Sequence, residues 1–190
     1  MGRGIALRVR AMSSSRVALI TGASAGLGEQ FAQLFARDGF DLILTARGLP
    51  RLEAVAQRLA HHKVKVHLIS EDLSQPGGAR RLFAAVQERG LAVHTLVNNA
   101  GFGSFGDFLD LPLEKEVEML NLNCVALLEL SHLFGAQMRA HKEGRILNVA
   151  STAAFQPGPY MATYYATKAF VLSFSEGLAH ELRDSGVTVR

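Results

Sequence analysis

The stretch RVALITGASAGLGEQFAQLFARDG, residues 16–39, decides the fold class of this chain. It begins with a continuous apolar run, residues 16–21, which is typical of a strand that is covered on both faces of a sheet. A glycine-rich turn follows, and residues 27–38 then carry apolar side chains at helical spacing until Gly39, a residue type that commonly ends a helix. A strand, a tight turn and a helix in this order predict the first unit of an α/β fold.

The same alternation of strand and helix continues along the rest of the chain. Further strands are predicted at residues 41–45, 64–70, 93–98 and 145–150, with a sixth beginning at 187–189. Helices are predicted at about residues 49–61, 78–88, 113–139 and 163–183. Short connections between them predict a doubly wound, parallel sheet of the Rossmann type, in three α/β/α layers. No repeat or linker is found, so residues 16–190 are predicted to form one domain.

The composition excludes several classes of protein. Of 190 residues, 48% are hydrophobic, which is enough to form a core. Only 19% are charged, a fraction too low for a disordered chain or a coiled coil. The net charge of +3 comes from the N-terminal segment, where Arg3, Arg8, Arg10 and Arg16 occur without an acidic residue. Without these four arginines the chain has 16 basic and 17 acidic residues, a net charge of −1, so nothing indicates a nucleic-acid surface.

The basic segment 1–15 has three interpretations: a targeting peptide, a disordered arm, or sequence upstream of a true start at Met12. Residues 1–11 lack the continuous apolar region of a signal peptide, and the start at Met12 is favoured. No segment reaches the ~20 apolar residues of a membrane span. A single cysteine, Cys124, excludes an internal disulfide, so we expect a reducing compartment, the cytoplasm.

Gly22, Gly26 and Gly28 lie in the turn between the first strand and the first helix. Glycine permits a tight turn and lets the backbone approach a pyrophosphate, and a helix N-terminus favours negative charge there. The pattern therefore predicts a dinucleotide site, with a ligand-free glycine turn as the alternative. No Lys-Ser or Lys-Thr pair follows the glycines, which argues against a Walker-type triphosphate loop.

All three tyrosines of the chain, Tyr160, Tyr164 and Tyr165, fall within six residues, and Lys168 follows them. A free phenol has a pKa of about 10, and a neighbouring ammonium favours its ionised form, which makes a phenol a better acid or base near neutral pH. Helical spacing places both Tyr164 and Tyr165 near Lys168. Spacing alone does not choose between them.

Three motifs together resemble the short-chain dehydrogenase/reductase (SDR) family. They are the TGxxxGxG turn at residues 21–28, the segment Asn98-Asn99-Ala100-Gly101 after the fourth strand, and Tyr164-x-x-x-Lys168. The resemblance runs from about Arg16 to the end of the chain. It implies an oxidoreductase that interconverts a carbonyl and a secondary alcohol with NAD(P)(H). It also implies a homodimer or homotetramer built on the helices at 113–139 and 163–183.

The same resemblance assigns four catalytic residues. Tyr164 is selected from the tyrosines and gives or takes the proton of the substrate oxygen, while Lys168 favours the ionised phenol and holds the nicotinamide ribose. Ser151, at the end of the fifth strand, orients the substrate oxygen, with an ordinary strand-end serine as the alternative. Asn123 supports a water relay to Lys168, although Asn121, two residues earlier, is a competing match.

Cofactor-binding residues follow from the resemblance as well. Asp72 and Leu73, after the third strand, match the position that contacts the adenine ring, with a turn or cap as the alternative for Asp72. The implied cofactor set combines the glycine turn, this adenine position, the segment after the fourth strand and two catalytic residues: Gly22, Ser24, Gly26, Leu27, Gly28, Arg47, Asp72, Leu73, Asn99, Ala100, Gly101, Tyr164 and Lys168.

The end of the second predicted strand indicates which nucleotide fits. It reads Thr45-Ala46-Arg47, where an NAD site would carry an acidic residue for the ribose 2′-OH. Arg47 instead offers a planar, permanently charged fork that suits a 2′-phosphate, and Arg51 lies four residues further on. The sequence therefore favours NADP(H) over NAD(H), with two solvated surface arginines as the alternative.

Other features limit the interpretation. The seven histidines form no HxxH or HxxxH pair, so no metal site is predicted, and Cys124 is interpreted as a packing residue. The segment 150–158 and the apolar helix at 113–139 resemble SDR reductases of hydrophobic or acyl-type substrates. Members of the family continue through a substrate-covering loop and a seventh strand, so we expect the last strands to be missing after Arg190. A non-catalytic NADPH-binding regulator and an inactive, truncated SDR remnant are the alternative functions.

Overall fold

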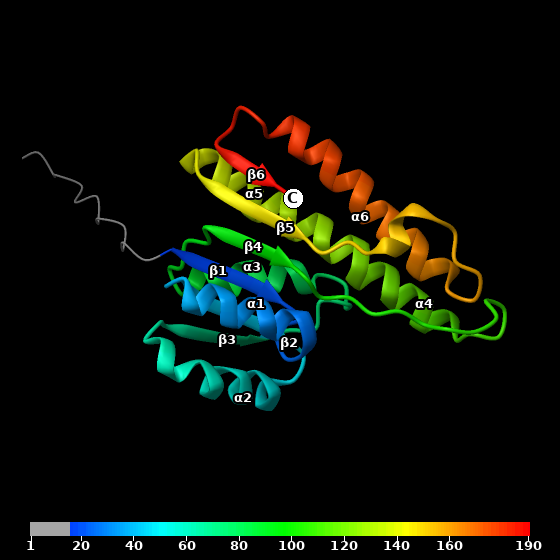
Figure 1. The fold of residues 1–190 in the computed structure, drawn as a ribbon, viewed down its shortest axis with the longest axis horizontal. Coiled ribbons are helices and arrows are strands. Elements are labelled where there is room, and N and C mark those ends of the chain that lie inside the picture. Colours follow the sequence, from blue (N-terminus) through cyan, green and yellow to red (C-terminus); the bar gives the residue numbers. More distant parts are fainter. Residues whose placement is uncertain (1–15) are drawn as a thin grey trace, which may run out of the picture.

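The computed structural model describes residues 16–190, and the predictions for the basic segment 1–15 lie outside the described residues. Six parallel strands form one sheet in the order β3-β2-β1-β4-β5-β6 (Figure 1). The strands are β1 (Val17–Thr21), β2 (Asp41–Ala46), β3 (Val66–Ser70), β4 (Thr95–Asn98), β5 (Gly144–Asn148) and β6 (Val187–Val189). The helices are α1 (Gly26–Arg37), α2 (Leu49–Leu59), α3 (Gly78–Glu88), α4 (Leu113–Leu120), α5 (Leu127–His141) and α6 (Ala162–Glu181). The predicted doubly wound, Rossmann-type fold is confirmed.

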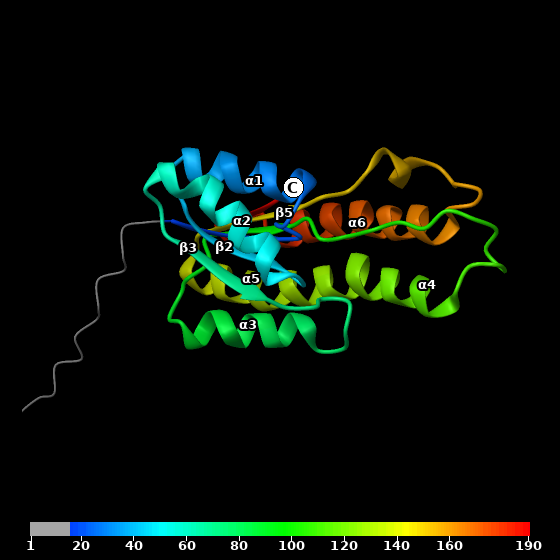
Figure 2. The same cartoon turned by 90° about the horizontal axis from the view of Figure 1, so that it is seen from below.

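Helices cover both faces of the sheet, which gives the three α/β/α layers (Figure 2). Alternate residues of a strand point to opposite faces. Ala18 and Ile20 of β1 therefore lie in a buried cluster with α1 and α2, and Leu19 lies in a second buried cluster with α3 and α5. Every residue of β1 is buried, which explains why its sequence is a continuous apolar run rather than an alternation of apolar and polar residues.

The order of the strands places a crevice beside β1. This strand pairs with β2 on one side, Ala18 opposite Leu42, and with β4 on the other side, Ala18 opposite Thr95. The chain reverses its direction of winding at the β1–β4 pair, because β2 and β3 lie on one side of it and β5 and β6 on the other. In sheets of this kind, ligands bind outside the carboxyl ends of the strands at such a switch point.

The predicted helix at 113–139 is a continuous helical segment, Leu113–His141, that includes α4 and α5. A wider, π-helical turn at Asn121–Ala126 separates the two helices. Turns of this kind occur frequently at functional sites. Here the turn contains Asn123, whose buried side chain contacts the loop after β4.

Within residues 16–190, Leu113–His141 is also the one helix that is long and apolar enough to cross a membrane, with a mean hydropathy of 1.3 over 18 residues. In this fold its second half packs against the sheet, where Leu130, Phe134 and Met138 are buried. A core helix that covers a sheet meets the same criteria of length and composition. The sequence-based expectation that no segment is apolar enough for a membrane span therefore does not hold for Leu113–His141. In this fold the segment packs as a core helix.

Candidate active site

A cavity of about 990 Å³, here called the large cavity, opens at the carboxyl ends of the strands beside the β1–β4 crevice. Its walls come from the loops that follow β1 to β5 and from the first turns of α6. Most of the predicted site residues line it: Gly22, Ser24, Leu27, Arg47, Asp72, Leu73, Asn99, Ala100, Gly101, Ser151, Tyr164 and Lys168. Gly26, Gly28 and Asn123 are not part of the lining and lie next to residues that are.

The glycine turn forms a backbone cradle at the start of α1. The angle φ is +64° at Gly22 and +58° at Gly26, values that residues with a side chain rarely adopt. At Gly28 a side chain is excluded by lack of space and not by the backbone angle. A Cβ there would collide with the carbonyl oxygen of Gly22 and lie 2.7 Å from Nδ2 of Asn99. A cradle that a side chain would fill, at a helix N-terminus, fits the pyrophosphate of a dinucleotide. Gly22, Gly26 and Gly28 are called the glycine cradle below.

Asn99 joins this cradle to the neighbouring strand. Its Nδ2 donates a hydrogen bond to the carbonyl oxygen of Thr21 at 2.9 Å, and its backbone N–H donates to Oγ1 of Thr21 at 3.0 Å. The N–H of Ala100 donates to the same Oγ1 at 2.9 Å. The end of β1 and the segment after β4 therefore form one connected wall of the large cavity.

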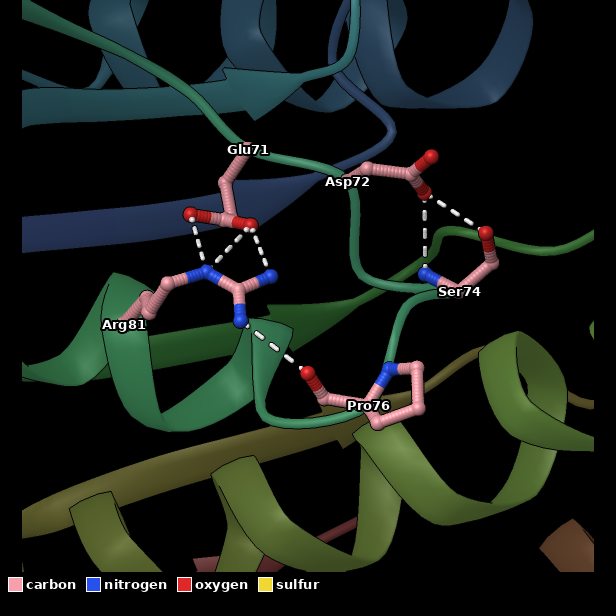
Figure 3. A network of polar contacts seen from close by, with 5 residues as sticks. All are labelled: Glu71, Asp72, Ser74, Pro76 and Arg81. Carbon is pink, nitrogen blue, oxygen red and sulfur yellow. Dashed lines mark hydrogen bonds and ion pairs between the residues drawn. The ribbon is translucent and has the colours of Figure 1, made fainter.

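Two acidic residues follow β3, and their carboxylates point to different partners (Figure 3). Glu71 forms an ion pair with Arg81 of α3, with an N–O distance of 2.8 Å. Oδ1 of Asp72 accepts hydrogen bonds from the backbone N–H and from the hydroxyl of Ser74, at 3.0 and 2.7 Å. These contacts fix the loop in which Asp72 and Leu73 line the large cavity, where the resemblance places the adenine ring.

Arg47 and Arg51 line the large cavity beyond the C-terminal end of β2. The carbonyl oxygen of Arg47 accepts a hydrogen bond from the hydroxyl of Ser70 at 2.8 Å, which fixes the backbone of Arg47 against β3. Its Nη1 lies 3.2 Å from Oε1 of Glu118 in α4. The sequence has no carboxylate at the end of β2, but the fold supplies one from a residue 71 positions away, a contact for which the sequence gives no signal.

Tyr164 and Lys168 lie one helical turn apart on α6, and both line the large cavity. Nζ of Lys168 donates to the carbonyl oxygen of Val149 at 2.8 Å and lies 5.8 Å from the centroid of the Tyr164 ring. The Lys168 side chain is buried, and this desolvation lowers the pKa of Lys168 from its usual 10.5, while the nearby Cys124 thiol opposes the shift. The ammonium is therefore fixed on the side of the cavity that carries the phenol.

Tyr165 does not line the large cavity. Its ring packs closely over Gly158, where an added Cβ would collide with three ring atoms. Helical spacing leaves Tyr164 and Tyr165 equivalent as neighbours of Lys168, and the fold separates them. Of the two tyrosines, only Tyr164 lines the cavity.

Ser151 follows β5 and also lines the large cavity. Its Oγ accepts a hydrogen bond from the backbone N–H of Ala153 at 3.1 Å, which caps a short 3₁₀ turn, Thr152–Phe155. This bond uses the hydroxyl oxygen as an acceptor. The hydroxyl therefore keeps its proton for donation to a ligand oxygen.

Asn123 lies behind the wall of the large cavity. Its Oδ1 accepts a hydrogen bond from the N–H of Phe102 at 3.1 Å, and its Nδ2 donates to the carbonyl oxygen of Phe102 and to Oγ1 of Thr167, at 2.9 and 3.1 Å. No hydrogen bond between Asn123 and Lys168 is present in the part of the chain that the structure describes. The two side chains approach the same space at Gly101, where a Cβ would lie 3.0 Å from Oδ1 of Asn123 and 3.8 Å from Nζ of Lys168.

Asn121, the competing match, faces away from this site. It lines a separate cavity of about 230 Å³, together with Gln75 before α3 and Glu129 on α5. Of the two asparagines that the sequence leaves open, Asn123 is therefore the one in contact with the wall of the large cavity.

The loop of residues 101–106 borders the large cavity, and its packing against Tyr164 is not predicted from the sequence. A Cβ at Gly103 would lie 3.0 Å from Cδ2 of Tyr164, so the loop packs directly against the tyrosine ring. The buried hydroxyl of Ser104 donates a hydrogen bond to the buried carboxylate of Glu116 on α4, which holds the loop in place. Three glycines within this segment are the signal in the sequence that indicates a close approach of backbone to a side chain.

Cys124 faces the backbone of α6, with Sγ 4.0 Å from the carbonyl oxygen of Thr167. Burial raises the pKa of Cys124 to about 11, although the charge of Lys168 acts in the opposite direction. A thiol that keeps its proton at neutral pH is a poor nucleophile, which fits a packing role. Among residues 16–190, no three His, Cys, Asp or Glu side chains gather in a way that could hold a metal ion.

Comparison with known families matches residues 16–190 to the short chain dehydrogenase family. The chain belongs to this family. One relative of this short-chain dehydrogenase is the very-long-chain 3-oxoacyl-CoA reductase of Podospora anserina, 35% identical over 177 residues, which cover 91% of this chain and 52% of that protein. Another is the 7beta-hydroxysteroid dehydrogenase of Collinsella aerofaciens, 33% identical over 172 residues, which cover 90% of this chain and 65% of that protein.

Solved structures of the family share the fold of this short-chain dehydrogenase. The bulky-bulky ketone specific alcohol dehydrogenase from Comamonas testosteroni has a TM-score of 0.88 and 35% identity, covering 94% of this chain and 71% of that one. A short-chain dehydrogenase from Sphingobium yanoikuyae, solved in complex with NADPH, has a TM-score of 0.87 and 38% identity, covering 92% and 69%. The chain spans about half to two thirds of the length of the two curated relatives described above.

Proposed function

We propose that this short-chain dehydrogenase is an NADP(H)-dependent oxidoreductase that interconverts a carbonyl and a secondary alcohol. One observation carries the proposal: a single cavity is lined both by Gly22 of the glycine cradle and by Ser151, Tyr164 and Lys168. Hydride transfer requires a nicotinamide and a carbonyl carbon side by side, with a proton donor at the carbonyl oxygen. The relatives are named as a 3-oxoacyl-CoA reductase, a hydroxysteroid dehydrogenase and a ketone-specific alcohol dehydrogenase, which supports the same class of reaction.

The residues of the large cavity fit a dinucleotide that carries a 2′-phosphate. The glycine cradle would hold the pyrophosphate, and Asp72 with Leu73 would contact the adenine ring. Arg47 and Arg51 would bind the 2′-phosphate through charge-assisted hydrogen bonds. When bound, the cofactor supplies or accepts the hydride. The NADPH complex of the Sphingobium yanoikuyae relative supports this choice of nucleotide.

Tyr164 would exchange a proton with the substrate oxygen, because it is the tyrosine that lines the cavity. Ser151 retains a hydroxyl proton with which to hold the same oxygen in place. Lys168, fixed by the carbonyl oxygen of Val149, would place a positive charge beside the phenol and favour its ionised form. Because Lys168 is buried, solvent screens that charge less than it would at the surface.

Asn123 would position the catalytic residues indirectly, through its hydrogen bonds to Phe102 and Thr167. Its amide bonds to both backbone groups of Phe102 and to Thr167, and so it fixes the loop after β4 against the helix that carries Tyr164 and Lys168. A water relay from Asn123 to Lys168 stays a prediction. Gly101 lies between these two side chains and, lacking a Cβ, leaves space between them.

The substrate end of the cavity indicates a hydrophobic carbonyl or alcohol. Phe102 and Met161 line the cavity together with Tyr164. Phe155 and Tyr160, in the segment between β5 and α6, are more than half exposed. A concentration of exposed apolar side chains around a cavity is typical of a binding surface for an apolar ligand.

The long helix carries a stripe of exposed apolar residues that supports a homodimer. Its members are each between 43 and 49% exposed: Val117, Leu120, Val125 and Leu128. They recur on one side of the helix, and a second copy of the chain would cover them. Light scattering of the whole protein should give a multiple of the chain mass. A monomer at micromolar concentration would remove the oligomer from the proposal.

The proposed reaction is tested with the whole protein, NADPH and a panel of bulky aliphatic and aromatic ketones. The loss of NADPH absorbance and the alcohol product, detected by mass spectrometry, are measured together. Reduction by the unmutated protein and its loss in Tyr164→Phe are the expected results. NADPH binding without turnover on every ketone would instead favour a non-catalytic NADPH-binding regulator.

A further inference from the structure

The large cavity has an anionic neighbour that the proposed NADP(H) site does not explain. Oε1 of Glu118 on α4 lies 3.2 Å from Nη1 of Arg47, and the Glu118 side chain is 33% exposed. Arg47 lines the cavity from the end of β2, so this ion pair connects two elements that are distant in sequence. It joins the arginine proposed to bind the 2′-phosphate to a carboxylate, which repels a phosphate.

The other acidic groups at this end of the cavity already have partners. Glu71 pairs with Arg81, and Asp72 accepts two hydrogen bonds from Ser74. Arg51 lines the cavity, and its side chain forms no hydrogen bond or ion pair within residues 16–190. Glu118 is therefore the carboxylate that faces Arg47.

We propose that Glu118 limits the selection of NADP(H) by competing with the cofactor 2′-phosphate for the guanidinium of Arg47. The inference rests on the proposed NADP(H) site. A phosphate that approaches Arg47 either displaces the carboxylate or comes to lie beside it as a like charge, and both outcomes weaken the binding of NADPH. NADH presents a neutral hydroxyl at this position, which a carboxylate does not repel, so Glu118 does not weaken the binding of NADH.

The geometry also sets the size of the effect. The Arg47 side chain is 69% exposed, so water screens the ion pair and its strength is modest. Pairs of this exposure change an equilibrium constant by about two- to fivefold. Removal of the Glu118 charge should therefore tighten NADPH binding by that factor.

The test compares Glu118→Gln with a matched control, Glu129→Gln. Glu129 forms a similar ion pair with Arg80, at 3.1 Å, with a carboxylate side chain that is 22% exposed. It lies outside the large cavity, so the control removes the same charge and a comparable contact elsewhere. Dissociation constants for NADPH and NADH are measured by nicotinamide fluorescence, which tryptophan does not disturb because the chain has none.

We expect Glu118→Gln to lower the NADPH dissociation constant about two- to fivefold and not to lower that of NADH. Glu129→Gln should change neither value. In an Arg47→Ala background, Glu118→Gln should tighten NADPH binding by less, because the guanidinium for which the two anions compete is gone and only their mutual repulsion is left. A melting curve is recorded for every variant to check that it is folded.

Two results would overturn the inference without touching the proposed function. Equal NADPH constants for the unmutated protein and a folded Glu118→Gln variant would show that there is no competition. Weaker NADPH binding in that variant would show that Glu118 positions Arg47 for the phosphate instead. Failure of the unmutated protein to bind NADPH would contradict the proposed function itself, and the inference with it.

Discussion

The two ends of the large cavity are built in different ways. At the nucleotide end, the glycine cradle is a local backbone structure between β1 and α1, and its shape depends on the absence of side chains. At the catalytic end, around Tyr164, side chains are held by partners from other elements: Lys168 by Val149, and Asn123 by Phe102. The nucleotide end is therefore sensitive to added volume, and the catalytic end to the loss of single polar atoms.

The largest effect is expected from the phenol at the catalytic end. Tyr164→Phe keeps the ring that packs on Gly103 and removes the transferable proton. Turnover of the whole protein should fall by roughly 10² to 10⁴-fold, with the NADPH dissociation constant nearly unchanged. Tyr165→Phe is the matched control and should be mild, because Tyr165 does not line the cavity and its ring packs against Gly158. If steady-state kinetics gave the larger loss for Tyr165→Phe, the assignment of the acid/base group to Tyr164 would be wrong.

The buried character of the catalytic end should be visible in the reactivity of Cys124. Its pKa is raised to about 11 from 9.0, so the thiolate fraction at pH 8 is about 10²-fold lower in the folded chain than in the unfolded chain. Alkylation by iodoacetamide should be slower by at least this factor without urea than with it. The rate for the unfolded chain should be half-maximal near pH 9, whereas that for the folded chain should be half-maximal near pH 11. A half-maximal rate near pH 9 in the folded chain would show that the thiol is not desolvated.

The nucleotide end is tested by adding one methyl group. Gly28→Ala would force the cradle apart at the Gly22 carbonyl, so it should destabilise the fold by ~1–3 kcal/mol and weaken NADPH binding. Gly177→Ala in α6 is the control, because nothing lies within 4 Å of its added Cβ. This control should stabilise the helix by ~0.5–1 kcal/mol. Urea unfolding curves measure both changes, and equal behaviour of the two variants would contradict the close approach at Gly28.

The features that could be predicted from the sequence depend on local patterns. The buried strand β1, the glycine turn and the helix that follows are contiguous, and the apolar run and the glycine spacing identify them directly. Local patterns locate the ends of strands less precisely: they predict the fourth strand at 93–98, and β4 covers Thr95–Asn98. The family resemblance supplied proposed roles for residues whose types alone are not distinctive, such as Ser151, and these roles stay predictions.

The features that could not be predicted depend on how distant segments meet. Spacing alone leaves Tyr164 and Tyr165 equivalent. The family resemblance selects Tyr164, and in the fold Tyr164 is the one of the two that lines the cavity. Glu118 on α4 meets Arg47 across 71 residues of sequence, and Ser104 in the loop after β4 meets Glu116 on α4 in the same way. No local pattern encodes such contacts, because each depends on the relative placement of two elements.

Titration with NADPH and NADH tests most directly whether the large cavity is a dinucleotide site that selects a 2′-phosphate. The unmutated protein should bind NADPH about tenfold or more tightly than NADH, because Arg47 adds a charge-assisted hydrogen bond to the phosphate. Arg47→Ala should remove most of that difference by weakening NADPH binding while leaving NADH binding unchanged. Equal dissociation constants for the two nucleotides in the unmutated protein would contradict the assignment of this end of the cavity.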